Sequence, residues 1–340
     1  MNWNIGLDIG TGGVRMAVHG RGVIYRQASA IAMRAGYEEP IAFGNEAQQL
    51  ISRVPIGVAV GHPMQGGTIA DEELLSQWFR YLLRHAAATN LVRRPKLLIS
   101  YAPEMQITPI RHMVALAMQA GAASCSVVRS DVAAALGAPI DVMRPQATLI
   151  VDLGAGKMTA SLISGGRVVD MHALPYGMQR IDETIVRRLR KSRGIAISLR
   201  TAEELKHALI GASGIQVPGV LIHAMDAECG FPKEFQIETD ELKNVLDPVV
   251  HGLKELIHQL LSGAHAELLA DLSDTGIVLS GGGAQLLGLD RILAEEFSLA
   301  CHLPEDPSTC VIRGINQIMD ADSKYEPLTT THASVLDKRN

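Results

Sequence analysis

The sequence has 340 residues, of which 47% are hydrophobic and 20% are charged, and it carries a net charge of −5. This composition is typical of a soluble globular α/β protein long enough for two domains, and its acidity gives no reason to expect a nucleic-acid partner. The cysteines form no Cys-x-x-Cys pair, which argues against the common zinc and disulfide patterns. No signal peptide is predicted and no apolar run reaches the roughly 18 residues of a spanning helix, so we expect a cytoplasmic protein.

Residues 5–18 open the chain as a predicted hairpin. An apolar strand delivers Asp8 to its end, the small residues 10–13 form the turn, and a second strand follows. Such a turn presents successive backbone N–H groups on a concave surface, which suits phosphate oxygens. The Asp8 carboxylate beside it would hold a water of a hydrated Mg²⁺.

The rest of the first half alternates between predicted strands and helices. The expected elements are a strand at residues 22–32, a short helix at 42–51, a helix capped by Asp71, a strand at 96–102, a helix at 109–121, a strand at 126–129 and a helix from 132. This order predicts one α/β unit of about 145 residues.

The second half starts by repeating the opening hairpin. Residues 149–163 again place a carboxylate, Asp152, at the end of an apolar strand before a turn of small residues. One Gly-rich hairpin would be weak evidence, because most are ordinary turns. Two such hairpins facing each other would clamp the phosphates of a nucleotide from both sides.

The remaining elements of the second half form a further α/β unit. They are a strand at residues 167–174, helices at 181–191 and from Thr201, a hairpin at 216–224 and 233–236, a helix or helix pair at 239–261, and a strand at 275–279. That strand runs into Ser280 and three glycines that are expected to open a helix at 286–297, an arrangement that suits a phosphate or a nucleoside. The polar residues after Asp320 are expected to be disordered.

Several stretches, in this order, carry a family resemblance: residues 8–11, 66–71, 151–156, 201–207, 277–284 and 305–314. They resemble the actin, hexokinase and heat-shock-chaperone ATPase superfamily, and more closely the MreB-like bacterial actins, over residues of about 4–319. The resemblance implies a two-lobed α/β fold of duplicated ribonuclease-H-like domains with small inserted subdomains. The implied boundaries are subdomain IA at 1–32 and 66–145, IB at 33–65, IIA at 146–180 and 246–320, IIB at 181–245, and a tail at 321–340.

The resemblance also implies ATP or ADP with Mg²⁺ in the cleft between the lobes, and a head-to-tail homopolymer. The metal would be held through water by Asp8 and Asp152. The nucleotide-binding residues that it implies are Asp8, Gly10, Thr11, Gly12, Gly13, Gly154, Ala155, Gly156, Lys157, Glu203, Lys206, Gly281, Gly282 and Gly283.

The sequence departs from the family at the catalytic position. The family has Glu-Glu-Pro where this chain has Arg129, Ser130 and Asp131, and the second Glu of the family orients the attacking water. A serine hydroxyl cannot act as a base near neutral pH, so the catalytic candidates are Asp152, Ser130 in place of the Glu, and Asp131 as a substitute. Lys157 stands where the family has Thr, and it either contacts a phosphate as a point charge or is a surface lysine. We expect slow or absent hydrolysis.

Residues 90–96 fall where MreB-like proteins carry a short membrane-touching loop. Leu91 and Val92 would enter the headgroup boundary, with Arg93, Arg94 and Lys96 attracted to anionic lipid. The alternative is that Leu91 and Val92 belong to the core. The inner membrane surface and membrane proteins are therefore possible partners.

Three functions fit these observations. The leading hypothesis is a bacterial actin-like cytoskeletal protein that binds Mg·ATP, forms filaments at the membrane and organises cell shape, cell-wall synthesis or another spatial task. The second is a non-polymerising pseudo-ATPase scaffold that has lost turnover. The third is a phosphotransferase of the same superfamily, although residues 33–65 and 181–245 are short for a typical substrate lobe.

Overall fold

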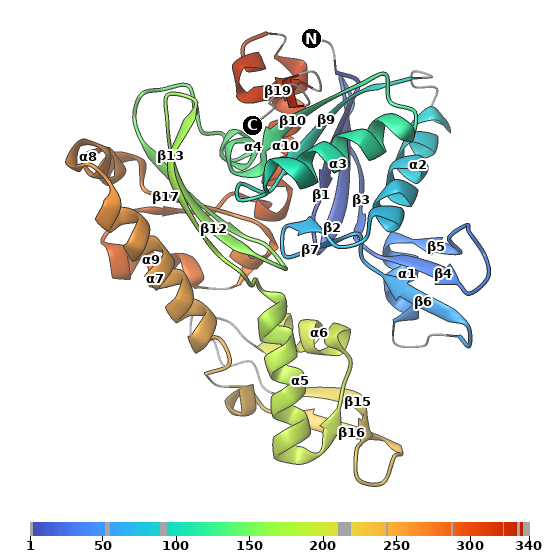
Figure 1. The fold of residues 1–340 in the computed structure, drawn as a ribbon. Coiled ribbons are helices and arrows are strands. Elements are labelled where there is room, and N and C mark those ends of the chain that lie inside the picture. Colours follow the sequence, from blue (N-terminus) through green and yellow to red (C-terminus); the bar gives the residue numbers. More distant parts are fainter. Residues whose placement is uncertain are drawn as a thin grey trace.

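Two sheets with the same plan form the body of the molecule (Figure 1). The computed structural model describes residues 3–51, 55–88, 94–209, 219–242, 244–286, 288–321, 323–331 and 334–335. In each sheet an antiparallel hairpin continues into a parallel strand: β1 pairs with β2 and with β9, and β11 pairs with β12 and with β17. The hairpin repeat in the sequence is therefore a repeat in the structure.

The first sheet has the strand order β19-β10-β9-β1-β2-β3. Helices α2 (Glu72–Ala88) and α3 (Ile107–Gln119) bury their apolar side chains against it. Asp71 caps α2 as expected, because its Oδ1 accepts a hydrogen bond from the N–H of Leu74 at 3.0 Å. The strands are β1 (Ile5–Ile9), β2 (Gly13–Val18), β3 (Gly22–Ala28), β9 (Lys96–Tyr101), β10 (Ser124–Arg129) and β19 (Thr329–Thr331).

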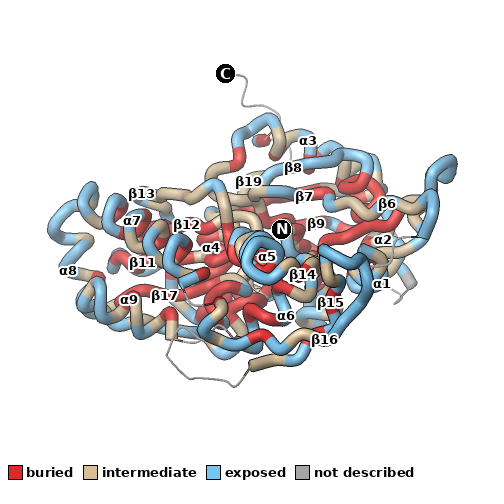
Figure 2. The backbone as a smooth tube through the Cα atoms, turned by 90° about the horizontal axis from the view of Figure 1, so that it is seen from below, coloured by how far each residue is buried: buried red, intermediate tan, exposed pale blue. Residues whose placement is uncertain are grey.

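The second sheet has the order β13-β12-β11-β17-β18. Its apolar residues form one core with α7 (Asp247–Gly263), α8 (Ala266–Thr275) and α9 (Leu289–Phe297). Figure 2 shows the buried strands inside and the exposed outer faces of the helices. The strands are β11 (Thr148–Leu153), β12 (Met158–Ser164), β13 (Arg167–Leu174), β17 (Ile277–Ser280) and β18 (Cys301–His302).

Helices α4 (Ser130–Gly137) and α10 (Cys310–Asp320) join the two halves. Their apolar residues share a core with Leu98 of the first sheet and Ile150 of the second. The two helices cross at backbone contact, because a Cβ added to Gly314 would lie 1.8 Å from the carbonyl oxygen of Ala133. Only glycine permits this crossing, which fixes how the two sheets sit.

Two small sheets project from the body in Figure 1, one from each half. The first contains β4 (Ile31–Arg34), β5 (Ala42–Phe43) and β6 (Val58–Gly61), covered by α1 (Gly44–Leu50). The second contains β14 (Ile195–Ala196), β15 (Val220–Asp226) and β16 (Pro232–Ile237), with α5 (Gln179–Arg193), α6 (Leu199–Leu209) and the 3₁₀ turn η1 (Thr239–Leu242). A two-stranded ribbon, β7 (Met64–Gln65) with β8 (Thr68–Ile69), lies on the first half.

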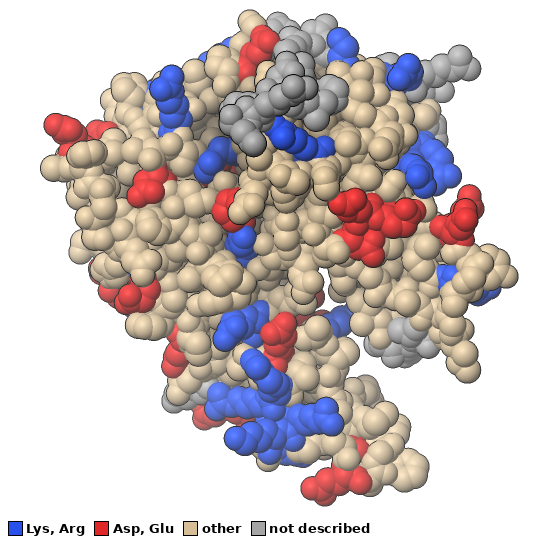
Figure 3. Space-filling model, in the orientation of Figure 1, with Lys and Arg blue, Asp and Glu red and all other residues tan. Residues whose placement is uncertain are grey.

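Helix α5, next to the second small sheet, carries many Lys and Arg side chains. Its exposed side chains include Arg187, Arg190 and Lys191. Figure 3 shows a group of cations at the lower end of the molecule, the end at which Figure 1 draws α5. Cations in the last turn also favour the helix, because that end carries partial negative charge.

Three expectations about local structure are wrong. The expected strand at residues 22–32 breaks after Ala28, and β4 joins a different sheet. Thr201 lies inside α6; the capping side chain is Ser198, whose Oγ accepts from the N–H of Thr201 at 3.1 Å. The glycines after β17 open the 3₁₀ turn η2 (Gly282–Gln285) rather than α9.

At residues 239–261 a helix pair, or one helix kinked near Pro248, was expected. The structure has two helical elements there, η1 followed by α7, and Pro248 lies in the first turn of α7.

The tail was also expected to be disordered, and its described residues are not. After the 3₁₀ turn η4 (Glu326–Leu328), strand β19 pairs antiparallel with β10 and completes the first sheet. Tyr325 and Val335 are buried. The polar composition misled because β19 is an edge strand with half-buried threonines, so few apolar residues are needed to hold it.

Candidate functional site

The two repeated hairpins face each other across one cleft of about 340 Å³. A cleft of this size suits a small ligand. Every nucleotide-binding residue implied by the resemblance lines it, from both halves of the chain. These residues are Asp8, Gly10, Thr11, Gly12, Gly13, Gly154, Ala155, Gly156, Lys157, Glu203, Lys206, Gly281, Gly282 and Gly283.

The turns of the two hairpins touch at the floor of this cleft. A Cβ added to Gly12 would lie 2.8 Å from the Cβ of Ala155, and one added to Gly156 would lie 2.6 Å from Oγ1 of Thr11. The glycines are therefore required for the two backbones to approach this closely. The contact places the exposed N–H groups of both turns around the same space.

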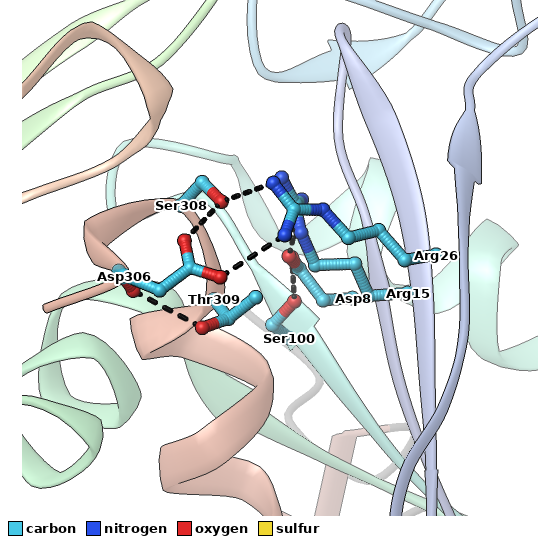
Figure 4. A network of polar contacts seen from close by, with 7 residues as sticks. All are labelled: Asp8, Arg15, Arg26, Ser100, Asp306, Ser308 and Thr309. Carbon is cyan, nitrogen blue, oxygen red and sulfur yellow. Dashed lines mark hydrogen bonds and ion pairs between the residues drawn. The ribbon is translucent and has the colours of Figure 1, made fainter. Parts of the chain in front are cut away.

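Asp8 already has partners for both of its carboxylate oxygens. Arg15 Nη1 donates to Oδ2 at 3.2 Å, and Ser100 Oγ donates to Oδ1 at 2.8 Å. Figure 4 shows this network together with Arg26, whose guanidinium binds Asp306 and Ser308 at 3.0 and 2.7 Å. Residues Arg15 and Arg26 line the cleft and were not anticipated from the sequence.

Asp152 is the other carboxylate expected to hold Mg²⁺ through water. Burial raises its pKa to about 6, and the neighbouring Asp8 carboxylate adds to the increase. The described residues contain no group of three or more His, Cys, Asp or Glu side chains that could hold a metal ion. Because Asp8 is neutralised by Arg15, the pair of carboxylates does not fit a hydrated Mg²⁺ in the way that the resemblance implies.

The catalytic candidates separate in the structure. Ser130 lines the cleft, as the position of the family's Glu would. Asp131 is 1% exposed and its carboxylate is held by Arg129 at 2.8 Å and by the hydroxyl of Ser161 at 2.7 Å. The idea that Asp131 substitutes for the missing Glu is wrong on this geometry, because its side chain is turned into the core beside β12.

Lys157 lies in the turn of the second hairpin and forms an ion pair with Glu104, which follows β9 in the other half. It lines the cleft and is not a free surface lysine, and its contact with a phosphate stays a prediction. The Glu104 side chain of this pair lies against Gly67. A Cβ added to Gly67 would lie 2.8 Å from the Glu104 Oε1, and the φ angle of Gly67 is +78°. This ion pair ties the turn of the second hairpin to the segment that follows β9 in the other half.

The opposite end of the cleft is formed by α6 and η2. Lys206 is only 4% exposed and pairs with Asp182 of α5 at 2.8 Å. Burial raises the pKa of Asp182 to about 6, although the Lys206 ammonium opposes the increase. Glu203 lies exposed at the rim, and the N–H of Gly281 donates to the carbonyl of Pro307 at 2.9 Å.

Four side chains of the cleft network escaped the sequence analysis: Arg15, Arg26, Glu104 and Asp182. The first could have been found, because a hairpin that turns at residues 10–13 places Asp8 opposite Arg15. The pairing of β2 with β3 then places Arg15 opposite Arg26. Glu104 and Asp182 meet their lysines only through the tertiary fold.

Comparison with known proteins gives the family. The family model described as MreB/Mbl protein matches residues 2–327. The chain belongs to the MreB/Mbl family of bacterial actins. The cell shape-determining protein MreB of Escherichia coli K12 is 30% identical over 320 residues, which cover 92% of this chain and 91% of that protein. The cell shape-determining protein Mbl of Bacillus subtilis 168 is 26% identical, covering 93% and 96%.

Solved structures of this family share the fold. MreB5 of Spiroplasma citri bound to ADP has a TM-score of 0.88 and 26% identity, covering 94% of this chain and 96% of that chain. The same protein bound to AMPPNP also has a TM-score of 0.88, with 27% identity and coverages of 96% and 98%. A MamK double helical filament has a TM-score of 0.78 at 17% identity, which shows the actin-like fold alone. The MreB-like bacterial actin implied by the sequence motifs is confirmed.

The predicted membrane contacts, Leu91 and Val92, lie outside the described residues. In the parts of the chain that the structure describes, no helix has both the length and the apolar character needed to cross a bilayer.

Proposed function

We propose that this MreB/Mbl protein binds ATP or ADP in the cleft between its two halves. The observation that carries the proposal is the convergence of both hairpin turns, the η2 glycines and α6 on one cleft. The structures of MreB5 of Spiroplasma citri, one bound to ADP and one to AMPPNP, support it. Asp8, one of the two carboxylates expected to hold Mg²⁺, is already paired with Arg15, so we propose the nucleotide rather than the metal as the ligand of this cleft.

Hydrolysis in this cleft is proposed to be slow or absent. Ser130 occupies the position of the water-orienting Glu, and Asp131 is held away from the cleft by Arg129 and Ser161. Positioning of the attacking water supplies much of the rate in such sites. The cleft keeps its phosphate loops, so binding does not depend on the lost carboxylate.

Replacing Ser130 by Glu tests the proposal that hydrolysis is slow because the water-orienting Glu is missing. We expect Ser130→Glu to raise the rate of phosphate release from ATP by tenfold or more, because general-base or water-positioning groups typically contribute about 10²–10⁴-fold. The measurement is single-turnover phosphate release, with Ser130→Ala as the matched control that should leave the rate unchanged. A Glu variant as slow as the parent chain would show that the missing carboxylate is not the limiting defect.

We further propose that the chain forms head-to-tail homopolymers in the cytoplasm, at the inner face of the membrane. Its membership of the MreB/Mbl family supports the polymer. The membrane part rests on Leu91 and Val92 alone. Two aliphatic side chains bind weakly, so a polymer would have to multiply their effect. Leu91→Asp should then abolish co-flotation with anionic liposomes; co-flotation that persists contradicts this part.

Sedimentation of the purified chain tests the polymer. We expect pelleting with ATP and with a non-hydrolysable analogue, because assembly then follows binding and not turnover. Pelleting in every condition, nucleotide-free included, would mean that assembly is uncoupled from the cleft. If nothing pellets and calorimetry detects no nucleotide binding, the chain is a non-polymerising scaffold.

A further inference from the structure

Arg15 places a fixed positive charge in β2, just after the turn of the first hairpin. It stands opposite Asp8 in the β1–β2 hairpin, and its guanidinium lies 3.2 Å from the Asp8 carboxylate. The two side chains are 18% and 13% exposed, and both line the cleft. In Figure 4 the Arg15 side chain reaches along the hairpin toward Asp8 and Ser100.

The chemistry of this pair differs from that of a water-holding carboxylate. Arginine cannot lose its proton in a protein, so the charge of Asp8 is cancelled permanently at close range. Both Asp8 oxygens accept hydrogen bonds, which leaves them few lone pairs for metal-bound water. The Arg15 Nε is buried and has no hydrogen-bond partner among the described residues, so the guanidinium keeps donor capacity.

Two more cations line the same cleft. Arg26 stands opposite Arg15 on β3 and is anchored to Asp306 and Ser308 beside the Gly281 backbone. Lys157 lies in the facing loop. Each of these cations is paired with a carboxylate, so a phosphate would take the place of Asp8 on the guanidinium fork of Arg15, whose geometry matches phosphate oxygens.

We propose that this cleft binds nucleoside di- and triphosphates through Arg15, with little dependence on Mg²⁺. The proposal rests on the proposed nucleotide binding and specifies how the phosphate charge is balanced. If Arg15 has only a structural role and merely closes the hairpin onto Asp8, nucleotide binding should still require Mg²⁺.

Nucleotide affinity with and without the metal separates these two roles. We would measure ADP and ATP binding by calorimetry in excess Mg²⁺ and in EDTA. The parent chain should bind with affinities that differ by less than about threefold. Arg15→Gln should lose at least about tenfold in EDTA and recover a substantial part in Mg²⁺, because the metal then replaces the missing charge. Lys254→Gln is the matched control, since it removes a cation from the ion pair with Glu296 outside the cleft.

If circular dichroism shows that Arg15→Gln does not fold, Asp8→Asn provides a second test. With Arg15 as the phosphate ligand, removing the Asp8 charge should raise affinity in EDTA. With Asp8 as a metal-water ligand, the same change should lower affinity in Mg²⁺, and that result would overturn the inference.

The failures of the inference and of the proposed function are distinguishable. Binding by the parent chain that needs Mg²⁺ overturns the metal independence and leaves the proposed function standing. Absence of binding in both buffers removes the proposed function itself. An Arg15→Gln variant that matches the parent chain in EDTA removes Arg15 from the phosphate site.

Discussion

At the scale of single residues, the cleft contains a carboxylate, Asp152, whose ionisation lowers the stability of the folded protein. Asp152 lies at the end of β11 with Asp8 nearby, and its environment favours the protonated acid. Ionised carboxylates in such positions are common where a protein keeps a binding site ready for a ligand. The cost should be measurable in the ligand-free protein.

Asp152→Asn should stabilise the ligand-free protein at neutral pH. The pKa of Asp152 rises from 3.8 to about 6 on folding, so the folded state keeps a proton that the unfolded chain loses between these values. Stability is therefore highest below pH 4 for this group, falls as pH rises toward 6, and carries the full penalty above 6. Asn cannot ionise, so the variant should gain about 1–3 kcal/mol at pH 7.5 and nothing at pH 4.

Urea unfolding at the two pH values gives this difference directly. Asp240→Asn, which removes an exposed carboxylate of η1, is the control and should show no comparable gain. Equal gains at pH 4 and pH 7.5 would show that ionisation of Asp152 is not the cause.

At the scale of elements, the α4–α10 crossing determines how the halves are joined. Each helix contributes a glycine at the contact: a Cβ on Gly137 would lie 1.8 Å from the carbonyl of Cys310, as close as the Gly314 contact to Ala133. Because these neighbours are backbone atoms, a side chain could be admitted only by moving one helix.

Gly314→Ala should therefore destabilise the protein, although alanine is the better helix former. Forced separation of packed elements costs about 1–3 kcal/mol, which exceeds the gain of roughly 1 kcal/mol in helix propensity. Gly263→Ala in α7 is the matched control, because its added Cβ would meet only Asp170 Oδ2 at 3.8 Å. Thermal unfolding should show a loss for the first variant and none for the second; equal melting temperatures would contradict the packing argument.

At the scale of the whole molecule, the cleft is closed by contacts between its halves. The Lys157–Glu104 ion pair is the charged contact between the second phosphate loop and the strand end after β9. Both side chains are about one-fifth exposed, at 20% and 22%, so solvent screens the pair only partly. Its loss should loosen the cleft rather than unfold either half.

Glu104→Gln should accelerate amide hydrogen exchange in the second hairpin loop and in the segment after β9, while the sheets stay protected. Hydrogen exchange followed by mass spectrometry resolves these segments. The control is Glu296→Gln, which breaks the Lys254 pair within the second half and should leave these two segments unchanged. Unchanged exchange of these segments in Glu104→Gln would mean that the backbone contacts alone hold the cleft.

The sequence alone predicted the duplicated α/β plan, the hairpins and the family, because these depend on local patterns: apolar runs ending in Asp, turns of small residues and their order along the chain. The residues that line the cleft followed from those motifs. The division into four subdomains and the roles of the site residues stay predictions. Local patterns failed where an element depends on a distant neighbour, as β19 depends on its pairing with β10.

The tertiary structure decided the charge balance of the cleft and which of the candidate site residues face it. Asp131 lies one residue from Ser130, yet its contact with Ser161 turns it into the core. Lys157 meets Glu104, and Lys206 meets Asp182, across separations of 53 and 24 residues. Electrostatic partners depend on distance in space and on burial, and neither can be read from position in the chain.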